Sequence, residues 1–168
     1  MKISAWSLVI CLALISCTRQ VYVVRHAEKV SSGDSLSKMM ANNPPLSEAG
    51  KVRAIVLRDE LKNKHIAHIY STNTVRAMST AAPLSESIHV QIEQYSSVDS
   101  LVHTIRSVKG NVLVVGHSNT VDDIVNKLCG TNKLTDLKDN TYDDLFVIKL
   151  TGNKGSFAQR KYGYPSNP

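Results

Sequence analysis

The sequence has few cysteines and few aromatic residues, and each scarcity excludes a class of protein. Three cysteines occur among 168 residues. Cys11 and Cys17 belong to an apolar amino-terminal segment, which leaves Cys129 without a disulfide partner, and we expect Cys129 to be a small buried apolar residue rather than a nucleophile. Aromatic residues make up 5% of the chain and the formal net charge is +6. Because the basic residues are scattered and not interleaved with aromatic ones, we expect no nucleic acid partner.

The chain also lacks an apolar run long enough for a comfortable membrane span. The apolar run at residues 3–15 is short and is typical of a secretory signal. Residues 14–17 (Leu-Ile-Ser-Cys) resemble the bacterial lipobox, where a signal peptidase cuts before a cysteine that receives lipid. We therefore expect residues 1–16 to be removed and Cys17 to anchor residues 17–168 to a bacterial membrane, as an exported lipoprotein of the cell envelope. A plain signal peptide and a short uncleaved anchor are the alternatives.

The remaining chain has the length of one domain, and strand and helix patterns alternate along it. We expect strands at 20–24, 68–70, 88–92, 111–116, 145–150 and 156–162, and helices at 46–64, from a cap among 71–73 to 85, at 97–108 and at 120–128 with Ser118 or Asn119 as cap. The run at 111–116 has no polar interruption among its four central residues, which is typical of a central strand covered on both faces. The alternation predicts a three-layer α/β/α sandwich with a largely parallel sheet. The polar segment 30–45 is expected to form a loop or short lid.

Charged side chains follow three of the predicted strands. Arg25 and His26 follow the first strand, Arg76 falls in the first turn of the helix after the second strand, and His117 follows the central strand. Because the carboxyl ends of parallel strands share one end of a sheet, these groups are expected to converge. Two guanidinium groups beside helix N-termini would form a pocket that selects anions such as phosphate. The alternative is a set of structural histidines and solvated surface arginines.

In such a pocket His26 is the candidate nucleophile, because a neutral imidazole can attack phosphorus and forms a reactive phosphoramidate. His117 is expected to stay protonated and, with Arg25 and Arg76, to stabilise the charge of the transferring group. With that much fixed positive charge, we expect no metal and no cofactor. His65 and His68 lie near each other in sequence without a cysteine or acid motif, so zinc is not expected there either.

Together the motifs resemble those of the histidine phosphatase superfamily, the phosphoglycerate mutase-like proteins. Residues 25–28 are similar to its signature, residues 46–50 to the opening of its first helix, residues 71–81 to its second motif and residues 116–118 to its third. The resemblance implies a phosphoglycerate mutase-like fold and a histidine acid phosphatase-type phosphohydrolase with a phosphohistidine intermediate on His26. Its substrate would be a phosphomonoester or phosphoramidate, on a small molecule or a phosphoprotein.

The proton donor matches the family pattern poorly. Glu28 is one candidate, and its alternative is a structural partner of a pocket arginine. Glu93 lies where many family members carry a glutamate, although its surroundings do not resemble the usual motif. Ser118, Asn119 and Lys29 are expected to contact the substrate. Without a usable acid, the alternative function is a non-catalytic module that binds phosphate or a phosphoprotein.

Overall fold

The structure is a computed structural model that describes residues 18–166 except residues 32, 34–37 and 41. Its elements in chain order are β1 (Thr18–Arg25), α2 (Glu48–Leu61), β2 (Ile66–Thr72), α3 (Val75–Ile88), β3 (Ile92–Tyr95), α4 (Val98–Ser107), β4 (Asn111–Gly116), α5 (Val121–Cys129), β5 (Asp144–Thr151) and β6 (Lys154–Lys161). The predicted signal segment and Cys17 lie outside the described residues. No helix in the described part of the chain combines the length and apolar character that a bilayer span requires.

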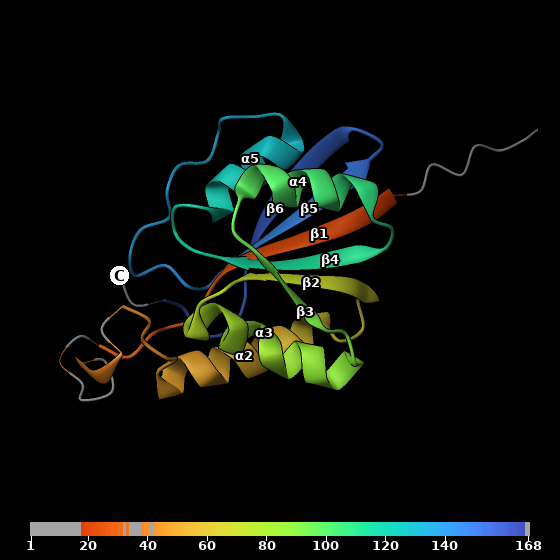
Figure 1. The fold of residues 1–168 in the computed structure, drawn as a ribbon. Coiled ribbons are helices and arrows are strands. Elements are labelled where there is room, and N and C mark those ends of the chain that lie inside the picture. Colours follow the sequence, from red (N-terminus) through yellow and green to blue (C-terminus); the bar gives the residue numbers. More distant parts are fainter. Residues whose placement is uncertain (1–17, 32, 34–37, 41, 167–168) are drawn as a thin grey trace, which may run out of the picture.

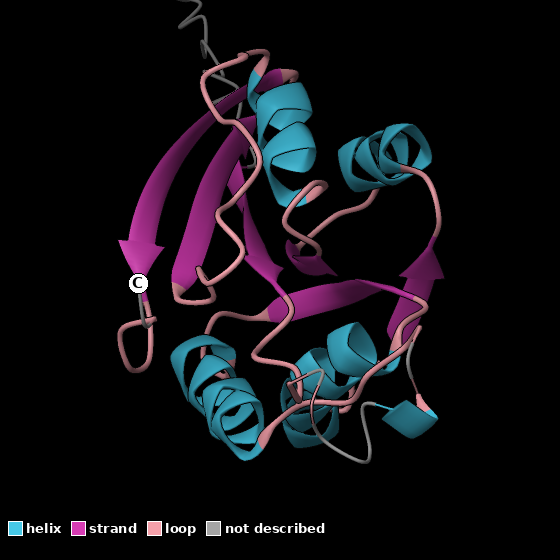
Figure 2. Ribbon diagram, turned by 90° about the vertical axis from the view of Figure 1, so that its left-hand side faces the viewer, coloured by secondary structure: helices cyan, strands magenta, loops and turns pink. Residues whose placement is uncertain are grey.

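The strands form one sheet in the order β3-β2-β4-β1-β5-β6 (Figure 1). The first four of these strands run parallel, whereas β5 is antiparallel to β1 and β6 is antiparallel to β5. Helices α2 and α3 cover one face and α4 and α5 cover the other, so that a pair of helices lies on each side of the sheet (Figure 2). The predicted three-layer α/β/α architecture with a largely parallel sheet is confirmed.

Alternating side chains of the central strands divide the core into two halves. In β1, Val21 and Val23 are fully buried in the half that contains α4 and α5, while Tyr22 and Val24 are buried in the half that contains α2 and α3. Each strand residue therefore faces a helical layer, which explains why the central strands read as unbroken apolar runs. This burial of both faces fixes the register of β1 against β4, and with it the position of the residue that follows each strand.

Strand β4 occupies the predicted residues 111–116, but β3 does not begin at residue 88 as expected. Helix α3 continues to Ile88 and ends at His89, whose backbone adopts a left-handed conformation with φ 56°. A residue in this conformation ends a helix, so strand pairing starts only at Ile92. The edge strand therefore begins at Ile92 rather than at residue 88.

Two predicted helix starts also differ from the structure. Strand β2 extends to Thr72, so the cap of α3 is Thr74, whose side chain accepts a hydrogen bond from the backbone N–H of Ala77. Helix α5 begins after Thr120, which makes no side-chain capping bond, rather than after Ser118 or Asn119. Thr120 Oγ1 instead accepts a hydrogen bond from the backbone N–H of His117, at 2.9 Å. Its side chain thus closes the turn that presents His117.

The segment that was expected to form a loop or lid leaves and returns at the carboxyl end of the parallel strands. Its base is closed by an antiparallel bridge between Lys29 and Leu46. Farther along, Asn43 Oδ1 accepts a hydrogen bond from the backbone N–H of Val75 at 2.9 Å. Because Val75 is the first residue of α3, this contact ties the segment to the helix that carries Arg76.

Candidate active site

His26 lies directly after β1, with 3% of its surface exposed. Its backbone N–H donates to the carbonyl of Gly116 at 2.9 Å, which extends the pairing of β1 with β4 by one residue. Its ring Nδ1 lies 2.8 Å from the carbonyl oxygen of Ala27. Since a carbonyl oxygen can only accept, Nδ1 carries the proton and the lone pair is on Nε2. Nε2 is therefore the nitrogen that can attack an electrophile.

The pKa of His26 is lowered from its ordinary value to about 3. Burial is the main cause, the backbone hydrogen bond to Ala27 opposes it, and the neighbouring Arg76, Arg25 and His117 act in the same direction as burial. At neutral pH the imidazole of the ligand-free site is therefore uncharged. A nucleophilic imidazole must be neutral, so the environment keeps His26 in the reactive form over a wide pH range.

Arg25, the last residue of β1, is anchored by the connection between α5 and β5. Its Nη1 donates to the carbonyls of Lys138 at 2.9 Å, Asp139 at 2.8 Å and Thr141 at 3.3 Å. The ring of Tyr142 lies 4.5 Å from the guanidinium carbon, in cation–π geometry. Arg25 is 5% exposed, and its Nε has no hydrogen-bond partner within the described residues. The guanidinium is thus fixed in place with a donor left over.

Arg76 and His117 meet on the other side of His26. Arg76 Nη2 lies 3.4 Å from His117 Nδ1, and His117 Nε2 lies 2.9 Å from Thr72 Oγ1. Because a guanidinium can only donate, Nδ1 accepts and the proton of His117 is on Nε2. The rings of His26 and His117 pack edge to face with centroids 5.2 Å apart. The structure therefore brings together Arg25, His26, Arg76 and His117 as the topology predicted.

The prediction that His117 is protonated while phosphate is transferred stays a prediction, but its surroundings in the structure favour the neutral ring. Burial lowers the pKa of His117 to about 4, and the charges of Arg76 and Arg25 act in the same direction. The same two effects lower the pKa of Arg76, burial first and then the charge of Arg25. Two guanidinium groups already supply positive charge to this small space, so a third charge is disfavoured until an anion enters.

The unpartnered donors of this cluster indicate the kind of ligand that it accepts. Nε and Nη1 of Arg76 are buried without a hydrogen-bond partner in the described part of the protein, as is Nε of Arg25. Buried donors of native proteins are nearly always paired, and charged donors are the costliest to leave unpaired. An oxyanion between the two guanidinium groups would satisfy them, and phosphate matches their fork geometry.

Glu28 does not lie among these groups, because its carboxylate pairs with Arg53 of α2. Arg53 Nε donates to both carboxylate oxygens at 2.9 and 3.0 Å, and Nη2 donates to Oε1 at 2.6 Å. Arg53 is buried and also donates to the carbonyl of Tyr162 at 3.0 Å. Glu28 thus occupies the structural role that was its alternative, although its partner is not a pocket arginine.

Glu93, the second candidate acid, lies on the edge strand β3. Its carboxylate oxygen is 3.6 Å from Nδ1 of His68 on the neighbouring strand, and its side chain is 57% exposed. The charges that shift the pKa values of His26 and His117 are all cationic and include neither glutamate. The structure therefore brings neither Glu28 nor Glu93 into contact with the two histidines.

The predicted substrate-contacting residues lie at the same end of the sheet but make no hydrogen bond to the four central side chains. Lys29 and Asn119 are exposed, and Ser118 is half-buried with its carbonyl accepting from the backbone N–H of Leu137 at 2.9 Å. Cys129, at the end of α5, is half-buried against the core, and burial raises the pKa of its thiol. This environment agrees with a packing role for Cys129.

Asp122 is buried in the first turn of α5. Its Oδ1 has no hydrogen-bond partner within the described residues. Burial raises the pKa of this carboxyl, and the charges of Asp123 and Asp136 also act on it. None of the four central side chains is among the groups that shift the pKa of Asp122, whereas Asp136, in the segment after α5, is one of them. Asp122 therefore lies where α5 meets the segment that follows it. Nowhere in the described ranges do three His, Cys, Asp or Glu side chains gather to hold a metal ion.

Three site residues were not predicted. Tyr142 places its ring 6.0 Å from that of His26, but it comes from a connection without a motif, so no sequence signal identifies it. Thr80 Oγ1 accepts from the backbone N–H of Ala27 at 2.9 Å and so helps to hold Ala27, whose carbonyl accepts from His26 Nδ1. Thr72 orients His117. Thr72 and Thr80 both lie within residues 71–81, the segment that resembles the second motif, and this is the signal that could have marked them.

Residues 21–101 match the family described as Histidine phosphatase superfamily (branch 1). Among curated proteins, none matches the chain at a significant level. The fold is similar to that of the protein histidine phosphatase SixA complexed with tungstate, with a TM-score of 0.67, 20% identity, and coverage of 84% of this chain and 96% of that chain. It is also similar to phosphoglycerate mutase from Bacillus anthracis, with a TM-score of 0.66, 16% identity, and coverage of 86% of this chain and 93% of that chain. A mycobacterial glucosyl-3-phosphoglycerate phosphatase has a TM-score of 0.62 and 12% identity, with coverage of 86% of this chain and 98% of that chain.

Proposed function

We propose that this chain, whose residues 21–101 match the Histidine phosphatase superfamily (branch 1), is a metal-independent phosphatase of that superfamily that works through a phosphohistidine on His26. The lone pair of Nε2 attacks phosphorus, and the bond from phosphorus to the leaving group breaks with its electrons going to that group. A water oxygen then attacks the phosphohistidine, the P–Nε2 bond breaks, and its electrons return to the imidazole. The observation that carries the proposal is the Nδ1 bond to Ala27, which leaves Nε2 free on a neutral, buried ring.

Arg25 and Arg76 would hold the equatorial oxygens of the transferring group. Three backbone carbonyls hold the guanidinium of Arg25, and both arginines keep buried donors without a partner in the described part of the chain, so Arg25 needs little reorganisation to bind an oxyanion. The dianionic phosphate would offset the two positive charges that lower the pKa of His117. His117 can then take up a proton and act as a third donor.

The cationic surroundings of His26 favour leaving groups that depart without a fixed carboxylic acid. Aryl phosphates release an aryl oxide and acyl phosphates release a carboxylate, and both are stable anions. A phosphohistidine substrate that is protonated on its free ring nitrogen releases a neutral imidazole. The name of the structurally similar SixA describes a protein histidine phosphatase, which supports a phosphoramidate as one substrate of this chain. We place alkyl phosphomonoesters below these compounds, because an alkoxide needs a proton as it departs.

The alternative function is a non-catalytic module that binds phosphate or a phosphoprotein. The observation in its favour is that neither Glu28 nor Glu93 acts on the two histidines. The two functions differ for substrates whose leaving group needs no acid. A module would bind acetyl phosphate without hydrolysing it, whereas the phosphatase turns it over.

The test is hydrolysis of acetyl phosphate and p-nitrophenyl phosphate by residues 18–168, with His26→Ala as the blank. We expect turnover that requires His26, is inhibited by vanadate and withstands a chelator. Labelled phosphate that is trapped on the protein as an acid-labile phosphohistidine, and that is absent in His26→Ala, would identify the intermediate. Activity that persists in His26→Ala, or that a chelator abolishes while vanadate does not affect it, refutes the mechanism.

We also propose that lipid on Cys17 holds the domain at a membrane of the cell envelope. The described chain enters the fold at Thr18, at the end of β1 opposite His26 (Figure 1). The connections at this end of the sheet carry basic side chains at Arg19, Lys64, Lys109 and Lys154. Positive side chains favour an anionic membrane surface, so this end would face the bilayer and the site would face away from it.

The anchor is tested with the full chain expressed in a bacterium that processes lipoproteins. We expect the protein in the membrane fraction and its Cys17→Ser variant in the soluble fraction. If both fractionate alike, the anchor is wrong, whatever the outcome of the phosphatase assays.

A further inference from the structure

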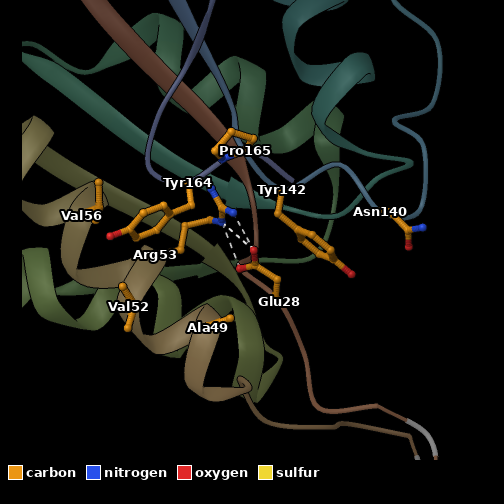
Figure 3. A pocket seen from close by; sticks show the side chains of 9 residues that line it. All are labelled: Glu28, Ala49, Val52, Arg53, Val56, Asn140, Tyr142, Tyr164 and Pro165. Carbon is orange, nitrogen blue, oxygen red and sulfur yellow. Dashed lines mark hydrogen bonds and ion pairs between the residues drawn. The ribbon is translucent and has the colours of Figure 1, made fainter. Parts of the chain in front are cut away.

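A cavity of about 620 Å³ lies beside α2, and Figure 3 shows the side chains that line it. Most of its wall is apolar and comes from three parts of the chain: α2, the connection before β5, and the tail after β6. The main lining residues are Ala49, Val52, Val56, Tyr142, Tyr164 and Pro165. Its size falls within the range of cavities that bind small organic ligands, and it is far larger than a phosphate group requires.

Tyr142 connects this cavity with the catalytic cluster. Its ring lines the cavity, lies 4.5 Å from the guanidinium carbon of Arg25, and is centred 6.0 Å from the ring of His26. Glu28, two residues after His26, lies at the same wall, where Figure 3 shows it bound to Arg53. Tyr142 is therefore the side chain that the cavity shares with the His26 site, and a group bound in the cavity would lie next to its ring.

The chemistry of the lining indicates what that extension is. Val52 is 46% exposed and Tyr164 is 75% exposed, and both line the cavity, so a ligand bound there would cover apolar surface that is now accessible to water. The charged groups at the wall, Glu28 and Arg53, are paired with each other, so they offer no free charge to a polar substituent. Apolar walls with aromatic rings instead favour a flat apolar group.

Resting on the proposed function, we propose that this cavity is the subsite for the leaving group and that it takes an apolar, preferably aromatic, group of a small phosphorylated compound. The assignment fits the cationic surroundings of His26, because an aryl oxide departs as a stable anion and needs no fixed acid. The site then selects its substrate through the group that leaves, while Arg25 and Arg76 hold the group that is transferred.

The test compares 1-naphthyl phosphate, which would fill the cavity, with acetyl phosphate, which would not. Val52→Asn makes one wall of the cavity polar without adding charge. Ile55→Asn is the matched control, because Ile55 is 43% exposed on the same helix but does not line the cavity. The readout is the ratio of kcat/KM for the two substrates, which cancels changes in folding and in His26 itself.

We expect the ratio to favour 1-naphthyl phosphate in the wild type, to fall about tenfold in Val52→Asn, the scale of losing one buried valine side chain, and to be unchanged in Ile55→Asn. Equal ratios in all three proteins overturn the subsite, while His26-dependent hydrolysis of acetyl phosphate would still support the proposed function. A loss confined to a phosphorylated protein substrate, with the ratio unchanged, assigns the cavity to a protein partner and also overturns the proposal.

A binding measurement decides the matter if no substrate turns over. We expect 1-naphthylphosphonate to bind more tightly than methylphosphonate in calorimetric titration, and this preference to be reduced by Val52→Asn but not by Ile55→Asn. In that case the cavity assignment holds and the proposed catalysis fails. Equal affinity of the two phosphonates for the wild type overturns the assignment.

Discussion

Replacing His26 with asparagine should change how the stability of the domain depends on pH. The amide of asparagine can keep the donor to the Ala27 carbonyl, but it does not titrate. Above pH 6.5 the His26 imidazole is neutral in both the folded and the unfolded chain, so titration contributes nothing. Below pH 6.5 the unfolded imidazole takes up a proton, whereas the folded one, with a pKa of about 3, does not. Wild-type stability therefore falls with falling pH, by about 1.4 kcal/mol per pH unit from this residue.

Between pH 6.5 and pH 4.5 the titration of His26 should thus cost the wild type about 3 kcal/mol that the variant does not lose. The assay is urea denaturation of both proteins at several pH values, followed by circular dichroism. His117 titrates in both proteins, so its contribution largely cancels in the difference. His103→Asn, which replaces an exposed imidazole on α4, is the matched control. A difference between wild type and His26→Asn that stays constant from pH 7.5 to pH 4.5 would refute the neutral, buried His26.

Arg76→Ala should lower kcat/KM for acetyl phosphate by about a hundredfold or more, since it removes donors aimed at the transferring group; steady-state kinetics with an unchanged circular dichroism spectrum measures this. Glu28→Gln should lower the free energy of unfolding by about 2 kcal/mol, because it leaves Arg53 buried without its counter-charge, while His26-dependent turnover changes only a few-fold. A hundredfold loss of turnover would instead make Glu28 the proton donor. Gly50→Ala should destabilise the domain in thermal melts by more than about 2 kcal/mol, because the added Cβ would clash with the Glu28 carbonyl oxygen at the start of α2.

The parts of the fold that the sequence predicts well are those that local pattern determines. The apolar run of β4 can only be a strand buried on both faces, and Ser47 is a cap whose side chain accepts from the backbone of Gly50. The position of β3 depends instead on where α3 ends. That helix extends to Ile88 because its apolar residues pack against β2, and the left-handed His89 that stops it has no distinctive residue type. Such boundaries are set by tertiary contacts that a local pattern does not contain.

The same division holds in the candidate site. Arg25, His26, Arg76 and His117 were predictable as a group, because each follows a strand and parallel strands align their carboxyl ends. The partner of Glu28 was not predictable, since Arg53 lies 25 residues away on α2 and resembles any surface arginine in sequence. Tyr142, from a connection without periodicity or motif, could not be placed without the structure.

The mechanism that we propose needs His26 neutral and His117 protonated, whereas the structure favours the neutral form of both rings. Burial and the two arginines lower the pKa of His26 to about 3 and that of His117 to about 4, so both rings are neutral before a ligand binds. A phosphate dianion offsets the arginines equally for both rings, but their hydrogen bonds differ. Nε2 of His26 has its lone pair committed to phosphorus, whereas Nδ1 of His117 faces the guanidinium of Arg76, which the phosphate can draw away. A proton that enters with the ligand is therefore retained by His117, and the nucleophile stays free.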